Sequence, residues 1–258
     1  MAYLLDVIVP QWNKASWTAH LVASIKQHAP DGTRIVLVDN GSKADELEMA
    51  LGSIGDYPCR LIENHENLGF IRGTNIGLCA SDAEYVVLQN NDTVIFQGTY
   101  QRMLANLKKS QDVGVIGPLC SEGESWQSIN NAFRLLDTQV TFSKNRSELL
   151  PHELAEELVK QFDGKRREVN GMVAFFCAMF PRKVIDKVGL LSIEYGLGFG
   201  DDDDYCERLR RAGYKILVAL DSYVYHAQRT TFKANFSNEE IEKMKKENLA
   251  KFKKKWNK

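Results

Sequence analysis

The chain has 258 residues, of which 44% are apolar and 26% are charged. This composition is typical of a soluble globular protein and excludes a small scaffold that needs disulfides, because a chain of this length buries roughly 75% of its unfolded surface. The 33 Lys and Arg residues against 34 Asp and Glu give a net charge of −1. No excess of positive charge is available for nucleic-acid phosphates, so we expect no nucleic-acid partner.

The first third of the chain alternates short β-branched runs with segments of helical period. This alternation predicts a mainly parallel α/β sheet with helices on its faces. The predicted strands are 4–9, 34–38, 59–62 and 85–88, and the predicted helices are 15–28, 42–51 (capped by Ser42) and 71–80. Polar residues follow several of these strands, at the edge where open α/β sheets bind their ligands.

A helix at 98–109 and a strand at 113–117 come next, and the alternation is then lost between Leu119 and Arg167. We interpret this stretch as an insertion or lid. It contains one amphipathic helix, whose apolar face carries Leu154, Leu158, Val159 and Phe162. Residues 170–180 predict a buried strand, with a helix that starts at Pro181. Further helix and strand segments follow the sequence GLGFGDDDD.

Asp39 closes the second predicted strand in the sequence VDNGS. A carboxylate there can accept hydrogen bonds from a nucleobase or a ribose, and small neighbours let a ligand approach the backbone. The same residues also make an Asx turn and a helix cap, and the motif alone does not decide between the two.

Gly69, Gly73 and Gly77 recur every four residues and leave a smooth stripe on one helix face. This stripe favours close packing of helix on strand over direct phosphate binding. Arg72 and Asn75 lie on other faces of the same helix, where an arginine near the N-terminus could hold a diphosphate.

Asn90 and Asp92 follow a buried strand and alternate toward the same side. Such a pair suits a divalent cation that is already chelated by a diphosphate, although Asn-Asn-Asp is also ordinary turn composition. His226 ends a later strand-like run. A lone histidine is more often structural, and here it is a candidate third metal ligand.

Four consecutive carboxylates, Asp201 to Asp204, precede an amphipathic helix. The helix dipole explains about two of them, and the mutual repulsion of four favours a functional carboxylate. The spacing does not alternate as a calcium loop requires. We interpret the preceding GLGFG as a hinge or acceptor-site loop.

Taken in order, these segments resemble the inverting nucleotide-sugar glycosyltransferases of family 2 with the GT-A fold, in particular the rhamnosyltransferase-like branch. The matching pieces are VIVPQWN, VDNGS, ENLGFIRGTNIGL, LQNNDT, NGMVAFFCAMFPRKVIDKVG and GFGDDDDYCERLRRAGY with His226, and they span residues 3 to about 230. The resemblance implies a Rossmann-like, mainly parallel sheet flanked by helices. Residues 1–118 would form its nucleotide-sugar half, residues 119–230 its acceptor-binding and catalytic half, and residues 231–258 a basic C-terminal helix.

The same resemblance implies the transfer of a sugar from a UDP- or dTDP-sugar to a hydroxyl of a glycan, glycolipid or protein acceptor. Asp202 would be the catalytic base, with Asp201 and Asp204 on the acceptor side. Asn90, Asp92 and His226 would hold Mg²⁺ or Mn²⁺, with Asn90 in the first position of the family's D-x-D motif. The expected nucleotide-sugar contacts are Pro10, Gln11, Asn13, Asp39, Asn67, Gly69, Arg72, Asn75 and Asn91.

Two other function classes compete. A nicotinamide dehydrogenase is disfavoured because no G-x-G-x-x-G follows the first strand. A non-catalytic sugar- or nucleotide-binding protein on the same fold is disfavoured by the presence of Asp92 and Asp202 together.

Features outside the motifs bear on where the protein works. The five cysteines are scattered and form no CxxC pair, and the apolar N-terminal stretch carries Asp6 and stops at Pro10, so we expect a cytoplasmic protein. The segment 239–258 has eight lysines and four glutamates, with Ile241, Met244, Phe252 and Trp256 at roughly helical spacing. This pattern suits weak association with an anionic membrane, at the inner face, or a helix that packs on its own domain.

Overall fold

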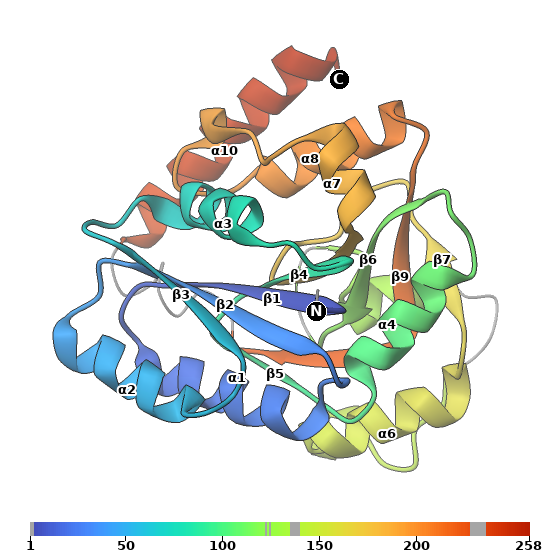
Figure 1. Ribbon diagram of the computed structural model, residues 1–258. Helices are drawn as coiled ribbons and strands as arrows, with labels where there is room; N and C mark the ends of the chain where they lie inside the picture. Colours follow the sequence, from blue (N-terminus) through green and yellow to red (C-terminus); the bar gives the residue numbers. More distant parts are fainter. Residues whose placement is uncertain (1–2, 122, 124, 135–139, 228–235) are drawn as a thin grey trace.

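A central sheet organises the molecule. Figure 1 shows the computed structural model, which describes residues 3–121, 123, 125–134, 140–227 and 236–258. Within this part of the chain, nine strands form the sheet in the order β3-β2-β1-β4-β8-β6-β9-β5, and β7 pairs with β9. The strands are β1 Leu5–Gln11, β2 Thr33–Asn40, β3 Cys59–Asn64, β4 Tyr85–Gln89, β5 Thr93–Ile95, β6 Val113–Leu119, β7 Arg166–Glu168, β8 Cys177–Pro181 and β9 Lys215–His226.

The directions of the strands decide where the site lies. β1 runs parallel to β2 and β4, β2 to β3, and β6 to β9. β8 runs antiparallel to both of its neighbours, β4 and β6. Because β8 reverses direction between them, β4 and β6 are parallel to each other, and the strands β1, β2, β4, β6 and β9 all end at one edge. The mainly parallel α/β fold predicted from the sequence is confirmed.

Helices cover both faces of this sheet (Figure 1). α3, α7 and α8 lie on one face and α1, α2 and α4 on the other, and each face has its own apolar core. Alternate residues of β1 feed the two cores, with Ile8 on the α3 side and Val7 and Val9 on the α1 side. The helices are α1 Ala15–His28, α2 Ala44–Ile54, α3 Gly69–Ala80, α4 Thr99–Lys108, α5 Ile129–Arg134, α6 Pro151–Phe162, α7 Arg182–Val188, α8 Asp201–Arg211 and α10 Asn238–Trp256, with 3₁₀ turns η1 Arg146–Glu148 and η2 Ile193–Tyr195.

The glycine stripe of α3 lets this helix approach the sheet closely. A Cβ atom on Gly77 would lie 2.4 Å from Cγ2 of Ile8, and one on Gly73 would lie 2.7 Å from Nδ2 of Asn40. No side chain fits at these distances. The predicted role of the stripe in helix-on-strand packing is confirmed.

Two predicted elements need correction. Residues 170–176 are not part of a strand, because the side chain of Gln127 binds this backbone, accepting from Ala174 N at 2.6 Å, and regular pairing begins only at Cys177. Ser42 does not cap α2. Its hydroxyl accepts a hydrogen bond from Asn13 N at 2.7 Å, and the helix begins at Ala44 without a side-chain cap.

Helix α6, within the region 119–167, is packed into the fold rather than placed over the site. Leu154, Leu158 and Phe162 of α6 are buried in the core that also contains Ile216 and Val218 of β9, while Val159 is only half-buried. Residues 135–139 of this region lie outside the described residues. The lid interpretation is therefore wrong for α6, which packs on β9.

The C-terminal helix α10 packs on its own domain. Ile241 is buried, and Met244, Phe252 and Trp256 are half-buried, so the apolar residues that we considered for a membrane are mostly covered by protein. This packing agrees with the second of the two interpretations given above. Among the described residues, no helix combines the length and the apolar character that crossing a bilayer requires.

Candidate active site

A cavity of about 790 Å³ opens at the edge where the parallel strands end. Gln11 and Asn40 are the last residues of β1 and β2, Asn90 and Cys120 directly follow β4 and β6, and His226 ends β9. The topology of the sheet therefore gathers polar side chains from five strands, as expected for a ligand site in an α/β fold. Ten residues predicted from the sequence line this cavity, namely Pro10, Gln11, Asn67, Gly69, Asn90, Asn91, Asp92, Asp201, Asp202 and His226.

Asn90, Asp92 and His226 meet at one side of the cavity. β5 pairs antiparallel with β9, and this pairing places Thr93 opposite His226. Nε2 of His226 lies 3.3 Å from Oδ1 of Asp92 and 3.5 Å from Nδ2 of Asn90. The ring of Phe176 stacks on the imidazole at 4.7 Å between centroids, which fixes its plane.

The chemistry of this donor set fits a divalent cation that is shared with a ligand. One carboxylate, one imidazole and one amide bind Mn²⁺ or Mg²⁺ incompletely, and a diphosphate can supply the remaining oxygens. No cluster of three or more His, Cys, Asp or Glu side chains suited to a metal occurs in the described part of the chain. The wider lining is acidic, with Asp201, Asp202, Asp203 and Glu242 against Lys245 and Lys246, and this charge also favours a cation.

Asp201 and Asp202 lie at the start of α8 and also line the cavity. Burial away from water raises the pKa of the Asp202 carboxyl well above its usual value, and the charges of Asp201 and Asp203 raise it further. Burial likewise raises the pKa of Asp201, which is 3% exposed. A carboxylate with a raised pKa is a stronger base than one in water.

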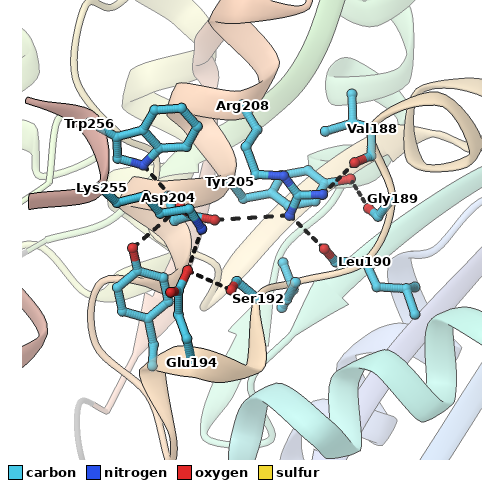
Figure 2. A network of polar contacts seen from close by, with 12 residues as sticks. Val188, Gly189, Leu190, Ser192, Glu194, Asp204, Tyr205, Arg208, Lys255 and Trp256 are labelled. Atoms are coloured by element: carbon cyan, nitrogen blue, oxygen red, sulfur yellow. Dashed lines mark hydrogen bonds and ion pairs between the residues drawn. The ribbon is translucent and has the colours of Figure 1, made fainter. Parts of the chain in front are cut away.

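Asp204 has a different role from the predicted one. Its side chain is fully buried and does not line the cavity. Oδ1 accepts hydrogen bonds from Trp256 Nε1 at 3.0 Å and from the Tyr195 hydroxyl at 3.3 Å, and it lies 2.8 Å from Nζ of Lys255 (Figure 2). The expectation that Asp204 lies on the acceptor side is therefore wrong, because its carboxylate binds α10 and the residue before the glycine-rich loop.

Four predicted donor contacts also lie outside the cavity lining: Asn13, Asp39, Arg72 and Asn75. Arg72 is exposed on α3. The amide of Asn75 exchanges two hydrogen bonds with the Leu191 backbone, both at 2.9 Å, so it fastens α3 to the segment after α7. This contact gives Asn75 a structural role that the sequence did not indicate.

Asp39 and Asn13 hold the loops after β1 and β2 together. Asp39 accepts from Gln11 Nε2 at 3.4 Å and from Ser42 N at 2.9 Å. The second bond reaches the backbone three residues on, one residue further than in an Asx turn. Asn13 N donates to the Ser42 hydroxyl, and Asn13 Oδ1 accepts from Lys43 N at 2.9 Å. Asp39 thus does not line the cavity itself, but it binds Gln11, which does.

One wall of the cavity comes from a segment that sequence reasoning did not assign to the site. Helix α10 contributes Glu242, Lys245, Lys246, Leu249 and Phe252. Aromatic rings were missed as well, among them Trp12, Phe70, Phe175 and Phe199. Trp12 stands between two predicted contacts, Gln11 and Asn13, and this position in the sequence could have indicated that it lines the site.

Comparisons with known proteins show similarity over most of the chain. Residues 6–189 match the sequence profile described as "Glycosyl transferase family 2". An uncharacterized protein of Mycobacterium tuberculosis is 25% identical over 241 residues, which are 90% of this chain and 77% of that protein. The glycosyltransferase GlyG of Streptococcus pneumoniae is 22% identical over 126 residues, 48% of this chain and 42% of its own length.

Solved structures share the fold. A mannosyltransferase of Pyrobaculum calidifontis, in complex with GDP-Man and Mn²⁺, superposes with a TM-score of 0.64 at 17% identity. GalNAc-T7 with UDP, GalNAc and Mn²⁺ gives 0.65 at 15% identity. The matches cover 91% and 87% of this chain, but only 60% and 44% of those two chains. With a family profile that spans most of its length, this chain belongs to glycosyl transferase family 2.

Proposed function

We propose that the protein transfers a sugar from a UDP- or dTDP-sugar to an acceptor hydroxyl with inversion, and that Asp202 is the catalytic base. The observation that carries this proposal is the arrangement of one cavity. Asn90, Asp92 and His226 form a cation-suited set at the ends of β4 and β9, and the Asp201–Asp202 pair comes from a different element, the start of α8.

Inversion needs two things that these groups can supply. An acceptor O–H must lose its proton on the face of the sugar opposite the leaving diphosphate, and Asp202 can take that proton as the new carbon–oxygen bond forms. The bond between the anomeric carbon and the diphosphate oxygen breaks, and negative charge collects on the departing nucleoside diphosphate. A bound Mg²⁺ or Mn²⁺ would offset this charge as a Lewis acid, held by Asp92, His226 and the Asn90 amide.

The comparisons support the general features of this proposal. Structures that share the fold were determined with GDP-Man and Mn²⁺, with UDP, GalNAc and Mn²⁺, and, for Staphylococcus aureus TarS, with UDP-GlcNAc. The choice of a uridine or thymidine donor and the rhamnosyltransferase-like branch rest on the sequence motifs. The aromatic rings of the lining, such as Trp12 and Phe199, suit the apolar faces of a glycan or glycolipid acceptor.

Two experiments test the proposal. Thermal-shift screening with UDP-, dTDP- and GDP-sugars, with Mn²⁺ or with EDTA, identifies the donor because a bound ligand raises the melting temperature by mass action. Affinity for UDP that is unchanged by EDTA would refute the metal assignment.

The second experiment measures transfer by Asp202→Asn. We expect a loss of about 10²- to 10⁴-fold, with nucleotide affinity unchanged, because the variant keeps the size but cannot accept a proton. The matched control is Asp45→Asn, an exposed carboxylate in the first turn of α2, which should keep full activity. If Asp201→Asn loses activity and Asp202→Asn does not, the base is Asp201. If neither does, the base does not belong to the Asp201–Asp202 pair, and the proposed role of Asp202 is refuted.

A further inference from the structure

Helix α10 carries a buried amide that the proposed chemistry does not use. Only Ile241 and Asn248 are buried among its nineteen residues, and the rest of the helix is mainly charged. Asn248 is 5% exposed. A buried polar side chain on a solvated helix is retained only if its hydrogen-bonding groups have partners.

Both donors of the Asn248 amide bind one loop. Nδ2 donates to the carbonyl oxygen of Tyr195 at 2.8 Å and to that of Gly198 at 2.9 Å. Oδ1 accepts from Nζ of Lys251 at 2.9 Å, and Lys251 also donates to the carbonyl oxygen of Glu194. The side chain thus braces the loop 195–200 at two points, and both points require an N–H donor.

The braced loop has a backbone that needs such support. Gly196, Phe199 and Gly200 have φ values of 68°, 68° and 87°, in the left-handed region. Phe199 is not a glycine, and a bulky residue holds this conformation only where its surroundings impose it. Gly200 is the N-cap of α8, and its carbonyl accepts from Asp204 N at 3.0 Å. The shape of the loop therefore decides where α8 begins.

The position of α8 in turn sets the positions of Asp201 and Asp202, its first two residues. The same loop also reaches the start of α3, since a Cβ on Gly69 would lie 2.9 Å from Cδ2 of Leu197 and 3.3 Å from its Cα. Gly69 and Leu197 both line the cavity. The loop thus joins the start of α3 to the pair of carboxylates, and Asn248 holds it from outside.

We propose that Asn248 is a positioning residue, which keeps the loop 195–200 in the conformation that directs Asp202 toward the acceptor hydroxyl. This inference rests on the proposed function for the identity of the base. Helix α10 would thus support the base through the bonds of the Asn248 side chain to the loop backbone, in addition to forming one wall of the cavity.

The test uses the full chain and the variants Asn248→Asp and Asn248→Gln. Asp has the same size but no donor, and it faces two carbonyl oxygens, whereas Gln keeps both donors. Glu247→Gln, at an exposed neighbour on the same helix, is the control. Three quantities are measured below the melting temperature of every variant: amide hydrogen exchange of residues 195–204, affinity for UDP with Mn²⁺, and kcat for UDP release. The donor for kcat is whichever of UDP-glucose, UDP-galactose and UDP-N-acetylglucosamine the wild type cleaves fastest.

For Asn248→Asp we expect at least tenfold faster exchange in the loop, at least tenfold lower kcat and a less than twofold change in UDP affinity. Asn248→Gln should recover part of both losses, and the control should match the wild type. Unchanged exchange would refute the brace, and faster exchange with unchanged kcat would refute positioning. A loss of UDP affinity as large as the loss of kcat would show a general structural role for Asn248 and overturn the inference. If the wild type releases no UDP, none of these three sugars is its donor, and the exchange measurement still decides whether Asn248 braces the loop.

Discussion

Replacing Asp204 with alanine should destabilise the protein without changing its affinity for an acceptor. Oδ1 of this buried carboxylate receives two hydrogen bonds, from Trp256 and Tyr195, and lies 2.8 Å from the Lys255 ammonium (Figure 2). Oδ2 accepts no hydrogen bond from the described residues and lies 4.0 Å from Nη1 of Arg208. The contacts of Oδ1 therefore dominate the expected loss.

The magnitude follows from which partners reach water after the substitution. The Lys255 side chain is 33% exposed and can be resolvated, whereas the Tyr195 side chain is 1% exposed and cannot. Losing a buried charge-assisted acceptor under these conditions costs about 2–4 kcal/mol. For a chain of this size that loss lowers Tm by roughly 5–15 °C.

The assay is urea denaturation, with acceptor KM measured well below Tm. Asp204→Asn is the informative partner variant, because its Oδ1 still accepts from Trp256 and Tyr195 and only the charge opposite Lys255 is lost. Asp204→Asn should lose less than half of the unfolding free energy that Asp204→Ala loses. The reasoning is refuted if Asp204→Ala loses under 1 kcal/mol, or if it raises the acceptor KM more than its stability loss explains.

Three further predictions concern the site and the sheet. The transfer rate should rise as the pH rises through the raised pKa of Asp202, since the base must be unprotonated. Between the ordinary pKa of an aspartate and this raised pKa, the wild type should lose stability relative to Asp202→Asn, because the folded state holds the proton more tightly than the unfolded state. Parallel melts and rates in a pH series check both signs. Asp92→Ala should weaken Mn²⁺-dependent UDP binding in calorimetry at least as much as Asn90→Ala, because only Asp92 brings a full charge, and the reverse order would contradict the assignment. Gly77→Ala should cost about 1–3 kcal/mol in urea denaturation, since its Cβ would lie 2.4 Å from Cγ2 of Ile8, and a neutral result would show that α3 can move off the sheet.

The sequence was informative where local pattern and strand direction are sufficient. The alternating strands and helices of residues 4–117 were located to within a few residues, apart from β5. The rule that ligands bind where strands end pointed to Asn90, Asp92 and His226, the family resemblance added Gln11, and all four line the cavity. These residues come from distant parts of the chain, and only the order of the strands unites them.

The sequence did not predict which side of a helix faces the site or which segment the helix packs against. Asp201 to Asp204 are identical letters in one helical turn, and each successive side chain is rotated by about 100°. Which of them faces the cavity depends on how α8 packs on the core through Tyr205, Cys206 and Leu209, and nothing in the run of aspartates specifies that. For the same reason the sequence left open whether α10 meets a membrane or packs on its own domain, and it did not indicate that Asn248 binds a loop fifty residues earlier.

The reciprocal bonds between the loops after β1 and β2 have a thermodynamic consequence for ligand binding. Asn13, Ser42 and Lys43 tie these two loops to each other. A ligand that contacts Gln11 or Asn40 therefore meets backbone that is already ordered, and little conformational entropy is lost on that side. Calorimetry of nucleotide binding should accordingly show a heat-capacity change set by the surface that the nucleotide covers, without the excess that accompanies the folding of a loop.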